Sequence, residues 1–236
     1  MAALEDTMWW YQAMHGRLID RMRRVWPTDR GSILDAGCGT GGLLRRIGQQ
    51  MPGLERIGLE YDAEAATIAV TKSAASVVIG NVNALPFLAN SFDVILSADV
   101  LYHGQVDDAV ASAEFCRCLK SGGSLFLNLP AYNWMKSGHD KHMHTRRRYT
   151  ARSARRLVEA AGLRVIGAGY WNCLLFPLMV LHRMTTGRET PKSDVQAFPF
   201  WLDRLFYAVT VVEKYLAQAG VRLPFGGSVW VSAIKP

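Results

Sequence analysis

Apolar runs of strand length alternate with stretches of helical periodicity along most of the chain. Runs such as Val94-Ile95-Leu96 are continuously apolar, which is typical of strands that are covered on both faces. Strands are expected at 32–36, 56–61, 76–79, 92–98, 124–129 and 163–166, and helices at 43–51, 63–73, 106–119 and 150–161. This alternation predicts an α/β fold, with a mainly parallel sheet and helices on both of its faces.

Two segments depart from the alternation. Residues 1–26 predict a single helix with an aromatic start, Trp9-Trp10-Tyr11, which Pro27 ends. A helical insertion interrupts the core at 171–227, with apolar stretches at 174–184 and 200–216, before a last strand at 228–234. The expected divisions are an N-terminal helical lid (1–30), a ligand-binding core (31–170), a helical cap insertion (171–227) and a final core strand (228–236).

A glycine-rich run, Asp35-Ala36-Gly37-Cys38-Gly39-Thr40-Gly41-Gly42, follows the first core strand. Glycines permit positive φ and close backbone approach, and the next helix presents free N–H groups, so the run predicts a ligand-binding loop. Its spacing fits both a dinucleotide loop and an S-adenosylmethionine loop. Asp35 favours the second, because a carboxylate at this position suits a cationic amino group and would repel a pyrophosphate.

Polar residues also follow the next strands. Glu60, at the end of the second strand, can accept both ribose hydroxyls of a nucleoside. Tyr61 could lie against an adenine face, and Asp62 is expected to cap the next helix. After the third strand, the Asn81 side chain and the Val82 backbone N–H can contact the edge of adenine.

These elements, in this order, resemble the class I S-adenosylmethionine-dependent methyltransferases over about residues 31–170 and again in the last strand. The resemblance implies a seven-stranded Rossmann-like methyltransferase sheet whose seventh strand is antiparallel, with S-adenosylmethionine as cofactor and S-adenosylhomocysteine as product. It assigns cofactor binding to Asp35, Gly37, Cys38, Gly39, Glu60, Tyr61, Asn81, Val82 and Ala98. The family often has Asp where this chain has Asn81, so the carbonyl is kept and the charge is lost.

The aromatic N-terminal helix resembles the lead helix of bacterial methyltransferases in surface-polysaccharide or lipid pathways. Such a helix could cover the cofactor and exclude water. Ordinary packing against the sheet edge is the alternative.

Candidate catalytic residues gather after the fourth and fifth strands. His103 is one base candidate, and His139 and His144 are two more in a stretch that also holds Arg146-Arg147-Arg148. Tyr102, Tyr132, Arg147 and Tyr149 are the expected substrate-binding residues, with the arginines able to hold a phosphate or carboxylate. The alternatives are a solvated basic loop for the cluster and a packed histidine at 103. No metal site is expected, because the histidine spacings lack a distant ligand.

Composition narrows the class of protein. With 236 residues, 50% hydrophobic and 20% charged, the chain is neither disordered nor a coiled coil, and four cysteines do not make a disulfide scaffold. We find no signal peptide, and Pro177 lies within the longest apolar stretch, so the protein is expected to be cytoplasmic or at most peripheral to a membrane face.

The expected function is S-adenosylmethionine-dependent methyl transfer to a small, apolar or lipid-like acceptor, by O- or N-methylation through in-line displacement. The net charge of +7 keeps an RNA or protein methyltransferase as an alternative, but the arginines concentrate in one loop, so nucleic acid is not the expected partner. A non-catalytic S-adenosylmethionine-binding protein is the second alternative. The insertion could cap an apolar pocket, rest on a bilayer, form a homodimer contact or only pack on the sheet.

Overall fold

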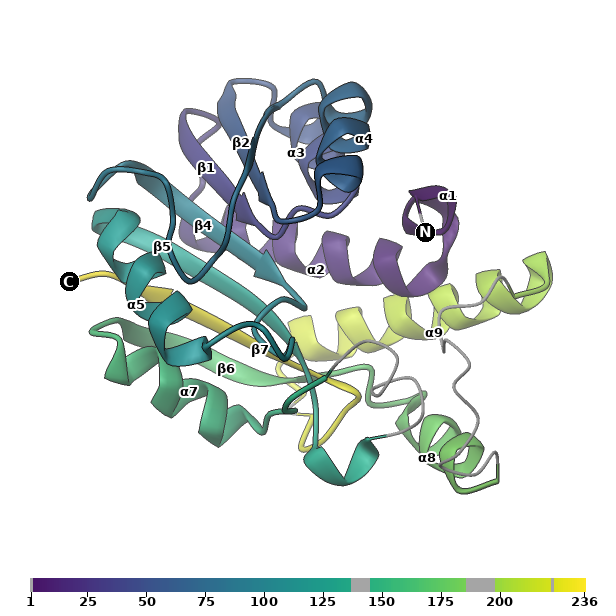
Figure 1. The fold of residues 1–236 in the computed structure, drawn as a ribbon. Coiled ribbons are helices and arrows are strands. Elements are labelled where there is room, and N and C mark those ends of the chain that lie inside the picture. The colour runs from purple at the N-terminus through teal and green to yellow at the C-terminus, as the bar shows by residue number, and fades with distance from the viewer. Residues whose placement is uncertain (1, 137–144, 186–197, 222) are drawn as a thin grey trace.

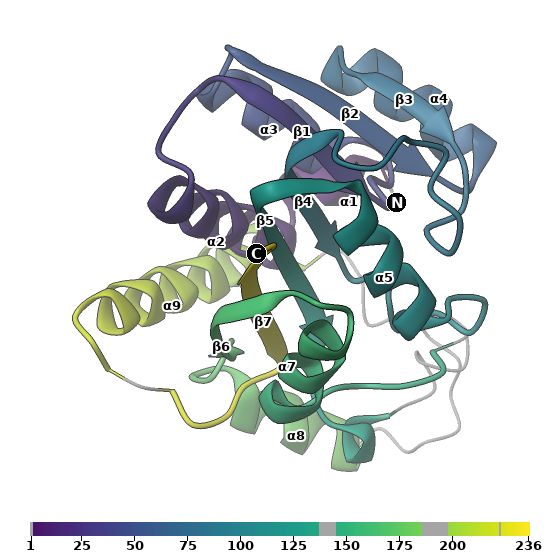
Figure 2. The ribbon, with the colours of Figure 1, turned by 90° about the vertical axis from the view of Figure 1, so that its left-hand side faces the viewer.

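The computed structural model describes residues 2–136, 145–185, 198–221 and 223–236. At its centre is a seven-stranded sheet in the order β3-β2-β1-β4-β5-β7-β6 (Figures 1 and 2). Strand β7 is antiparallel to both of its neighbours, whereas the pairs from β3 to β5 are parallel. The predicted Rossmann-like methyltransferase sheet with an antiparallel last strand is therefore confirmed. The strands are β1 (Gly31–Ala36), β2 (Leu54–Glu60), β3 (Ser76–Ile79), β4 (Phe92–Ala98), β5 (Leu119–Pro130), β6 (Arg164–Trp171) and β7 (Ser228–Ile234).

Helices cover both faces of this sheet. Helices α2, α3, α4 and α9 lie on one face and α5 and α7 on the other, with α9 running along α2 (Figure 1). The helices are α1 (Ala2–Thr7), α2 (Trp9–Val25), α3 (Gly42–Gln50), α4 (Ala63–Ser73), α5 (Asp108–Cys118), α7 (Ala151–Ala160), α8 (Phe176–Thr185) and α9 (Phe200–Gln218), with a 3-10 turn at Asn133–Met135. In the described ranges, no helix is long and apolar enough to cross a bilayer.

The two faces of the sheet have separate hydrophobic cores. In β5, Phe126 packs with α2 and α3, whereas Leu125 and Leu127 pack on the opposite side with α5 and α7. Successive side chains of a strand point to opposite faces, so a central strand under two helix layers must be apolar at every position. This is the physical reason for the continuous apolar runs in the sequence.

The N-terminal segment differs from the prediction of one helix over 1–26. Met8 is extended, with φ −67° and ψ 132°, and separates α1 from α2. The backbone N–H of Trp9 donates to Asp203 Oδ1 of α9 at 2.9 Å, so α9 supplies the N-terminal cap of α2. A cap from a residue 194 positions away leaves no local signal in the sequence.

Some strand boundaries also differ. We expected a strand to begin at 163–166, without predicting its end, and β6 runs to Trp171; β5 begins at Leu119 rather than 124. Strand β7 pairs with β5 and β6 over its whole length, and this pairing extends β6 to Trp171. Helix α7 begins as expected, with Thr150 as N-cap and its hydroxyl accepting from Ser153 N at 3.1 Å.

A buried carboxylate ties α9 to the rest of the fold. Glu213 accepts backbone N–H donors from Asn172 at 2.7 Å, Cys173 at 2.5 Å and Leu174 at 3.0 Å. Its carboxylate also pairs with Arg17 of α2 at 3.2 Å. Glu213 is 1% exposed and Arg17 8%, so this ion pair fixes the turn from β6 to α8 from within the protein.

Candidate functional site

The glycine run forms a tight bend between β1 and α3. Gly37, Gly39 and Gly41 have φ values of 87°, 54° and 84°, in the region that favours glycine. A Cβ on Gly37 would lie 2.2 Å from Val100 Cγ2, so the residues after β4 press directly on this bend. The bend is held to β2, since the N–H groups of Gly37 and Cys38 both donate to Leu59 O, at 2.8 and 3.0 Å.

Acidic side chains surround the bend. Asp35 is 2% exposed, and burial raises its pKa well above the ordinary value, with further increases from the negative charges of Glu5 and Glu60. A cation placed among these acids would relieve that repulsion. These carboxyl groups therefore fit a ligand that has a cationic group beside a neutral nucleoside. They do not fit a pyrophosphate, whose negative charge they would repel.

Glu60 braces the bend from the end of β2. One carboxylate oxygen accepts from Gly39 N at 2.8 Å, and the other accepts from Tyr61 N at 2.9 Å and Asp62 N at 3.0 Å. A carboxylate offers about four acceptor positions, so one remains on the oxygen that faces Gly39. Asp62 caps α4 as predicted, accepting from Ala65 N at 2.8 Å, and the Tyr61 ring is mostly exposed at the rim.

The remaining predicted cofactor residues lie on neighbouring elements of this edge. Asn81 follows β3 and accepts from Asn83 N at 2.9 Å through its side-chain oxygen, and Val82 beside it is buried. Ala98 ends β4 opposite Asn128 of β5. Cys38 is buried next to Asp35 and Glu60, and burial with these charges raises its pKa, so its sulfur is a thiol.

Asp99 was not among the candidate catalytic residues, although it follows Ala98 directly. Its backbone has φ 52°, and its carboxylate oxygens lie 3.1 and 3.2 Å from Asn128 Nδ2. Burial raises the pKa of Asp99 to about 7, against lowering by the Asn128 bond and the Arg148 charge. The available signal in the sequence was a carboxylate at the end of a buried apolar strand, a position that favours a functional group.

Helix α2 supplies further side chains at this edge. Burial raises the pKa of Tyr11 to about 12, with contributions from Glu5 and Asp99. His15, one turn later, is 3% exposed, and burial with the Arg46, Lys72 and Arg45 charges lowers its pKa to about 3. Its Nδ1 has no hydrogen-bond partner within the described part of the chain, which is the kind of orphaned polar atom that a ligand can satisfy.

The stretches after β4 and β5 come together. Arg146 N donates to Tyr102 O at 2.8 Å, and the ring of His103 stacks on that of Tyr102 with centroids 4.3 Å apart. Tyr149 OH lies 2.9 Å from both Leu101 O and Asp108 Oδ2. Arg147 forms an ion pair with Asp108 as well.

These contacts do not test the predicted catalytic and substrate-binding roles, which stay predictions. His139 and His144 lie outside the described residues. Among the described residues, no group of three or more histidine, cysteine, aspartate or glutamate side chains could hold a metal ion.

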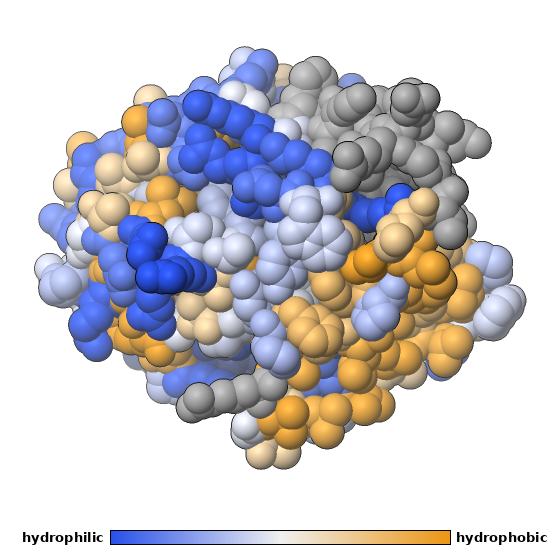
Figure 3. Space-filling view, turned by 90° about the horizontal axis from the view of Figure 1, so that it is seen from below, coloured by the Kyte–Doolittle hydropathy of each residue, from blue (hydrophilic) through white to orange (hydrophobic). Residues whose placement is uncertain are grey.

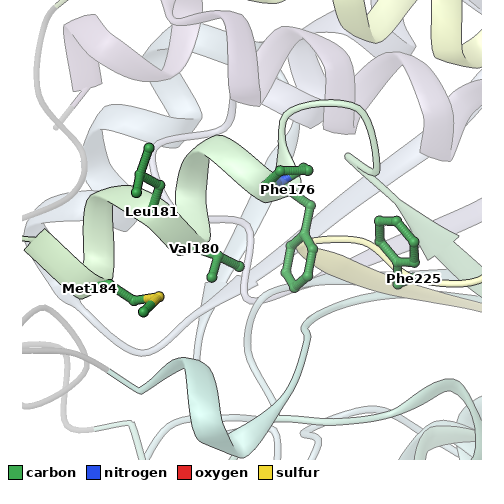
Figure 4. A pocket seen from close by; sticks show the side chains of 6 residues that line it. Phe176, Val180, Leu181, Met184 and Phe225 are labelled. Atoms are coloured by element: carbon green, nitrogen blue, oxygen red, sulfur yellow. The ribbon is translucent and has the colours of Figure 1, made fainter.

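Aromatic side chains lead from the end of β5 to α8. Tyr132 stacks on Tyr170 at 5.4 Å and contacts Phe176 at 5.6 Å between ring centroids. Phe176 in turn lines an open apolar groove of about 440 Å³. Figure 4 shows Met184, Val180 and Phe176 in a row on one side of α8, with Phe225 beside Phe176. Hydrophobic residues gather on one side of the lower face of the molecule (Figure 3).

Helix α1 lies over the glycine bend. Glu5 accepts from Gly42 N at 3.0 Å and from Lys72 Nζ at 2.9 Å, and it also bonds the Thr40 hydroxyl. Asp6 pairs with Lys72 at 2.8 Å and with Arg45 at 2.9 Å. Ion pairs to both α3 and α4 therefore hold α1 beside the candidate site.

Comparisons with known proteins agree with this geometry. A family model described as a methyltransferase domain matches residues 34–127. A provisionally named methyltransferase of Encephalitozoon cuniculi is 34% identical over 135 residues, which cover 56% of this chain and 59% of that protein. The demethylmenaquinone methyltransferase of Roseiflexus castenholzii is 31% identical over 127 residues, or 49% of this chain and 53% of that protein. The matches thus span a little more than half the length of these relatives.

Solved structures show the same fold over nearly the whole chain. Geranyl diphosphate C-methyltransferase from Streptomyces coelicolor, in complex with geranyl diphosphate and S-adenosylhomocysteine, has a TM-score of 0.66 at 16% identity. The similarity covers 95% of this chain and 79% of that one. Together with the strand order, these likenesses show that the chain has the fold of the class I S-adenosylmethionine-dependent methyltransferases, and that residues 34–127 match a methyltransferase domain.

Proposed function

We propose that this protein transfers a methyl group from S-adenosylmethionine to a small, apolar or lipid-like acceptor. The observation that carries the proposal is the pair of carboxylates, Asp35 and Glu60, on either side of the glycine bend. Asp35 would hold the cationic amino group and Glu60 the ribose, at its free acceptor position near Gly39. When bound, the cofactor supplies a methyl group already activated on a sulfonium.

Other residues of the edge complete the proposed cofactor site. The backbone of Gly37, Cys38 and Gly39 would follow the methionine part, with Ala98 beneath it. Asn81 and Val82 would contact the adenine edge, and Tyr61 would cover its face. Each of these residues lies at the carboxyl end of a parallel strand or in the loop after it, where ligands bind in open α/β sheets.

The apolar groove supports an apolar acceptor. It is lined by hydrophobic side chains, and the rings of Tyr132 and Phe176 connect it to the end of β5. The geranyl diphosphate bound in the Streptomyces structure carries a hydrocarbon chain of the kind that such a groove could take. Transfer to oxygen or nitrogen remains the proposed reaction.

Calorimetry with S-adenosylmethionine, S-adenosylhomocysteine and NAD tests the cofactor. We expect saturable binding of the first two and none of NAD. Release of S-adenosylhomocysteine is then measured across a panel of hydroxylated and amino lipids, isoprenoids and small metabolites. Binding of NAD alone would refute the proposal, and cofactor binding without turnover on any acceptor would favour a non-catalytic S-adenosylmethionine-binding protein.

If the acceptor binds in the apolar groove, a charge placed there should weaken acceptor binding. Val180→Asp places a charge among the side chains of the groove, so the KM for a hydrocarbon-bearing acceptor should rise about tenfold or more, with a smaller change in kcat. Leu88→Asp is the control, because Leu88 is 83% exposed and lies outside the groove. Equal KM values for the two variants would mean that the acceptor does not use the groove.

We also propose that residues 1–30 act as a lid on the cofactor. Glu5→Gln weakens the bonds to Gly42 N and Lys72, so α1 should exchange its amide hydrogens faster and S-adenosylhomocysteine should dissociate about threefold to tenfold faster. Hydrogen exchange and stopped-flow release measure the two effects. Faster exchange with unchanged release would show that α1 packs at this edge without covering the ligand.

An RNA or protein substrate is less well supported. Several arginines already form ion pairs within the chain, including Arg17 with Glu213, Arg117 with Glu114 and Arg147 with Asp108. RNA affinity that falls steeply with salt would support this alternative. Membrane contact and a homodimer through the exposed apolar residues of α8 and α9 also remain proposals, to be tested by vesicle flotation and sedimentation velocity.

A further inference from the structure

Asp99 is fixed at the centre of the candidate site. Its backbone N–H donates to Asn128 O at 2.8 Å, and the following residue, Val100, presses on Gly37 in the glycine bend. The register of β1 and β4 pairs Asp35 with Leu96, so Asp99 lies just beyond the sheet edge where β1 gives way to the bend. Asp99 as a residue is half-buried and not fully buried, so a ligand can approach it.

A hydrogen bond from Trp171 fixes the orientation of the Asn128 side chain, the hydrogen-bond partner of Asp99. Trp171 Nε1 donates to Asn128 Oδ1 at 2.7 Å, and because an indole can only donate, this bond turns Asn128 Nδ2 toward Asp99. Asn128 is 2% exposed, so it cannot rotate freely. The Asp99 carboxylate is thus held by a neutral amide on one side, and no other donor in the described part of the chain bonds to it, which leaves acceptor positions for a proton or a ligand.

Desolvation and two nearby side chains set the pKa of Asp99. Asn128 of β5 and the Arg148 charge, from the segment before α7, lower its pKa, but desolvation is larger and the pKa is about 7. The Asp99 charge contributes to raising the pKa of Tyr11, in α2, to about 12, so the Tyr11 hydroxyl is neutral at physiological pH. Asp99 is therefore near half-protonated at neutral pH and would respond to a new cation nearby.

We propose that Asp99 is a catalytic residue which loses its proton when the sulfonium charge binds beside it and then accepts the proton of the acceptor's O–H or N–H. This inference rests on the proposed function. A lone pair of the acceptor forms the new bond to the methyl carbon, the carbon–sulfur bond breaks and its electron pair returns to sulfur, and the acceptor proton moves to Asp99. The positive charge of the sulfonium and the negative charge of the carboxylate disappear together, so charge balances.

A comparison of proton release on binding S-adenosylmethionine and on binding S-adenosylhomocysteine tests the proposed role of Asp99 without any acceptor. S-adenosylmethionine and S-adenosylhomocysteine share the amino group and ribose, so Asp35 and Glu60 should respond equally to both. Only the first carries the sulfonium. Calorimetry at pH 7 in buffers of different ionisation enthalpy should therefore show about half a proton more released by S-adenosylmethionine, as expected for a carboxyl with a pKa of about 7.

Asp99→Asn should remove this difference while both ligands still bind. Asp93→Asn, at the other end of the same strand and paired there with Lys120, should preserve it. In the unaltered protein, the affinity for S-adenosylmethionine relative to that for S-adenosylhomocysteine should rise as the pH increases toward about 7 and level off above it. The total rise is about tenfold for each unit by which the sulfonium lowers the pKa of Asp99, and it lies between that lowered pKa and about 7.

Equal proton release by the two ligands in the unaltered protein would overturn the assignment, as would a difference that persists in Asp99→Asn. Loss of binding of both ligands in that variant would overturn it as well, because Asp99 would then belong to the cofactor-binding residues. If neither ligand binds the unaltered protein, the proposed function itself fails and this inference fails with it. Once an acceptor is known, kcat in Asp99→Asn should fall about 10²–10⁴-fold, as for loss of a general base.

Discussion

Replacing Asp35 with asparagine is expected to weaken the binding of S-adenosylhomocysteine and S-adenosylmethionine by at least about 30-fold. The carboxylate is buried beside the glycine bend, and removing one partner of a buried charge pair costs about 2–5 kcal/mol of binding free energy. Asparagine keeps the size of the side chain and removes only the charge. Calorimetric Kd values for the two ligands measure the effect.

We expect Asp35→Asn to lose ligand affinity without losing thermal stability. The pKa of Asp35 is raised in the folded state, so the protein loses stability as the pH rises from the ordinary value of about 3.8 toward that raised value. At neutral pH this carboxyl group therefore lowers the stability of the fold relative to acidic pH when no ligand is bound, and Asp35→Asn should keep or raise the Tm. Asp62→Asn is the control at the same edge, where an asparagine can still cap α4. A Tm decrease that accompanies the lost affinity would assign Asp35 to the fold instead.

Glu213→Gln should lower the free energy of unfolding by about 3–5 kcal/mol. The change leaves the Arg17 guanidinium buried without its charged partner and turns an amide NH₂ toward backbone N–H donors. Unfolding in urea, followed by circular dichroism, measures the loss.

The matched control is Glu159→Gln, which breaks the exposed ion pair with Arg155 on α7. An exposed pair of this kind contributes about 0.5 kcal/mol or less, so the control should be close to the unaltered protein. If both variants lose the same small amount, Glu213 does not anchor the β6–α8 turn in the way its contacts indicate.

The cofactor side of the site could be predicted from the sequence because its residues are local to strand ends. Asp35, Glu60 and Asn81 each follow an apolar run, and the carboxyl ends of parallel strands must meet at one edge of the sheet. The acceptor side is different. Asp99 follows β4, Tyr11 lies in α2 and Asn128 in β5, so their relation depends on how α2 crosses the sheet.

Neither the break at Met8 nor the charge state of Asp99 could be predicted from the sequence. The first depends on a cap from Asp203, and the second on desolvation by residues distant in the chain. The partner of Arg147, in the basic segment before α7, could not be predicted from the sequence either. Arg147 suggested an anion clamp, and the fold places its charge against Asp108 of α5.

The order of strands and helices and the residues of the glycine bend were determined by the sequence itself, because periodicity, glycine and caps act over a few residues. The tertiary structure alone decided which carboxyl groups have a raised pKa, which acids Arg17 and Arg147 pair with, and where α1 and α9 contact α2. The reason is that desolvation and ion pairing depend on distances between segments, and those distances exist only once the chain is folded.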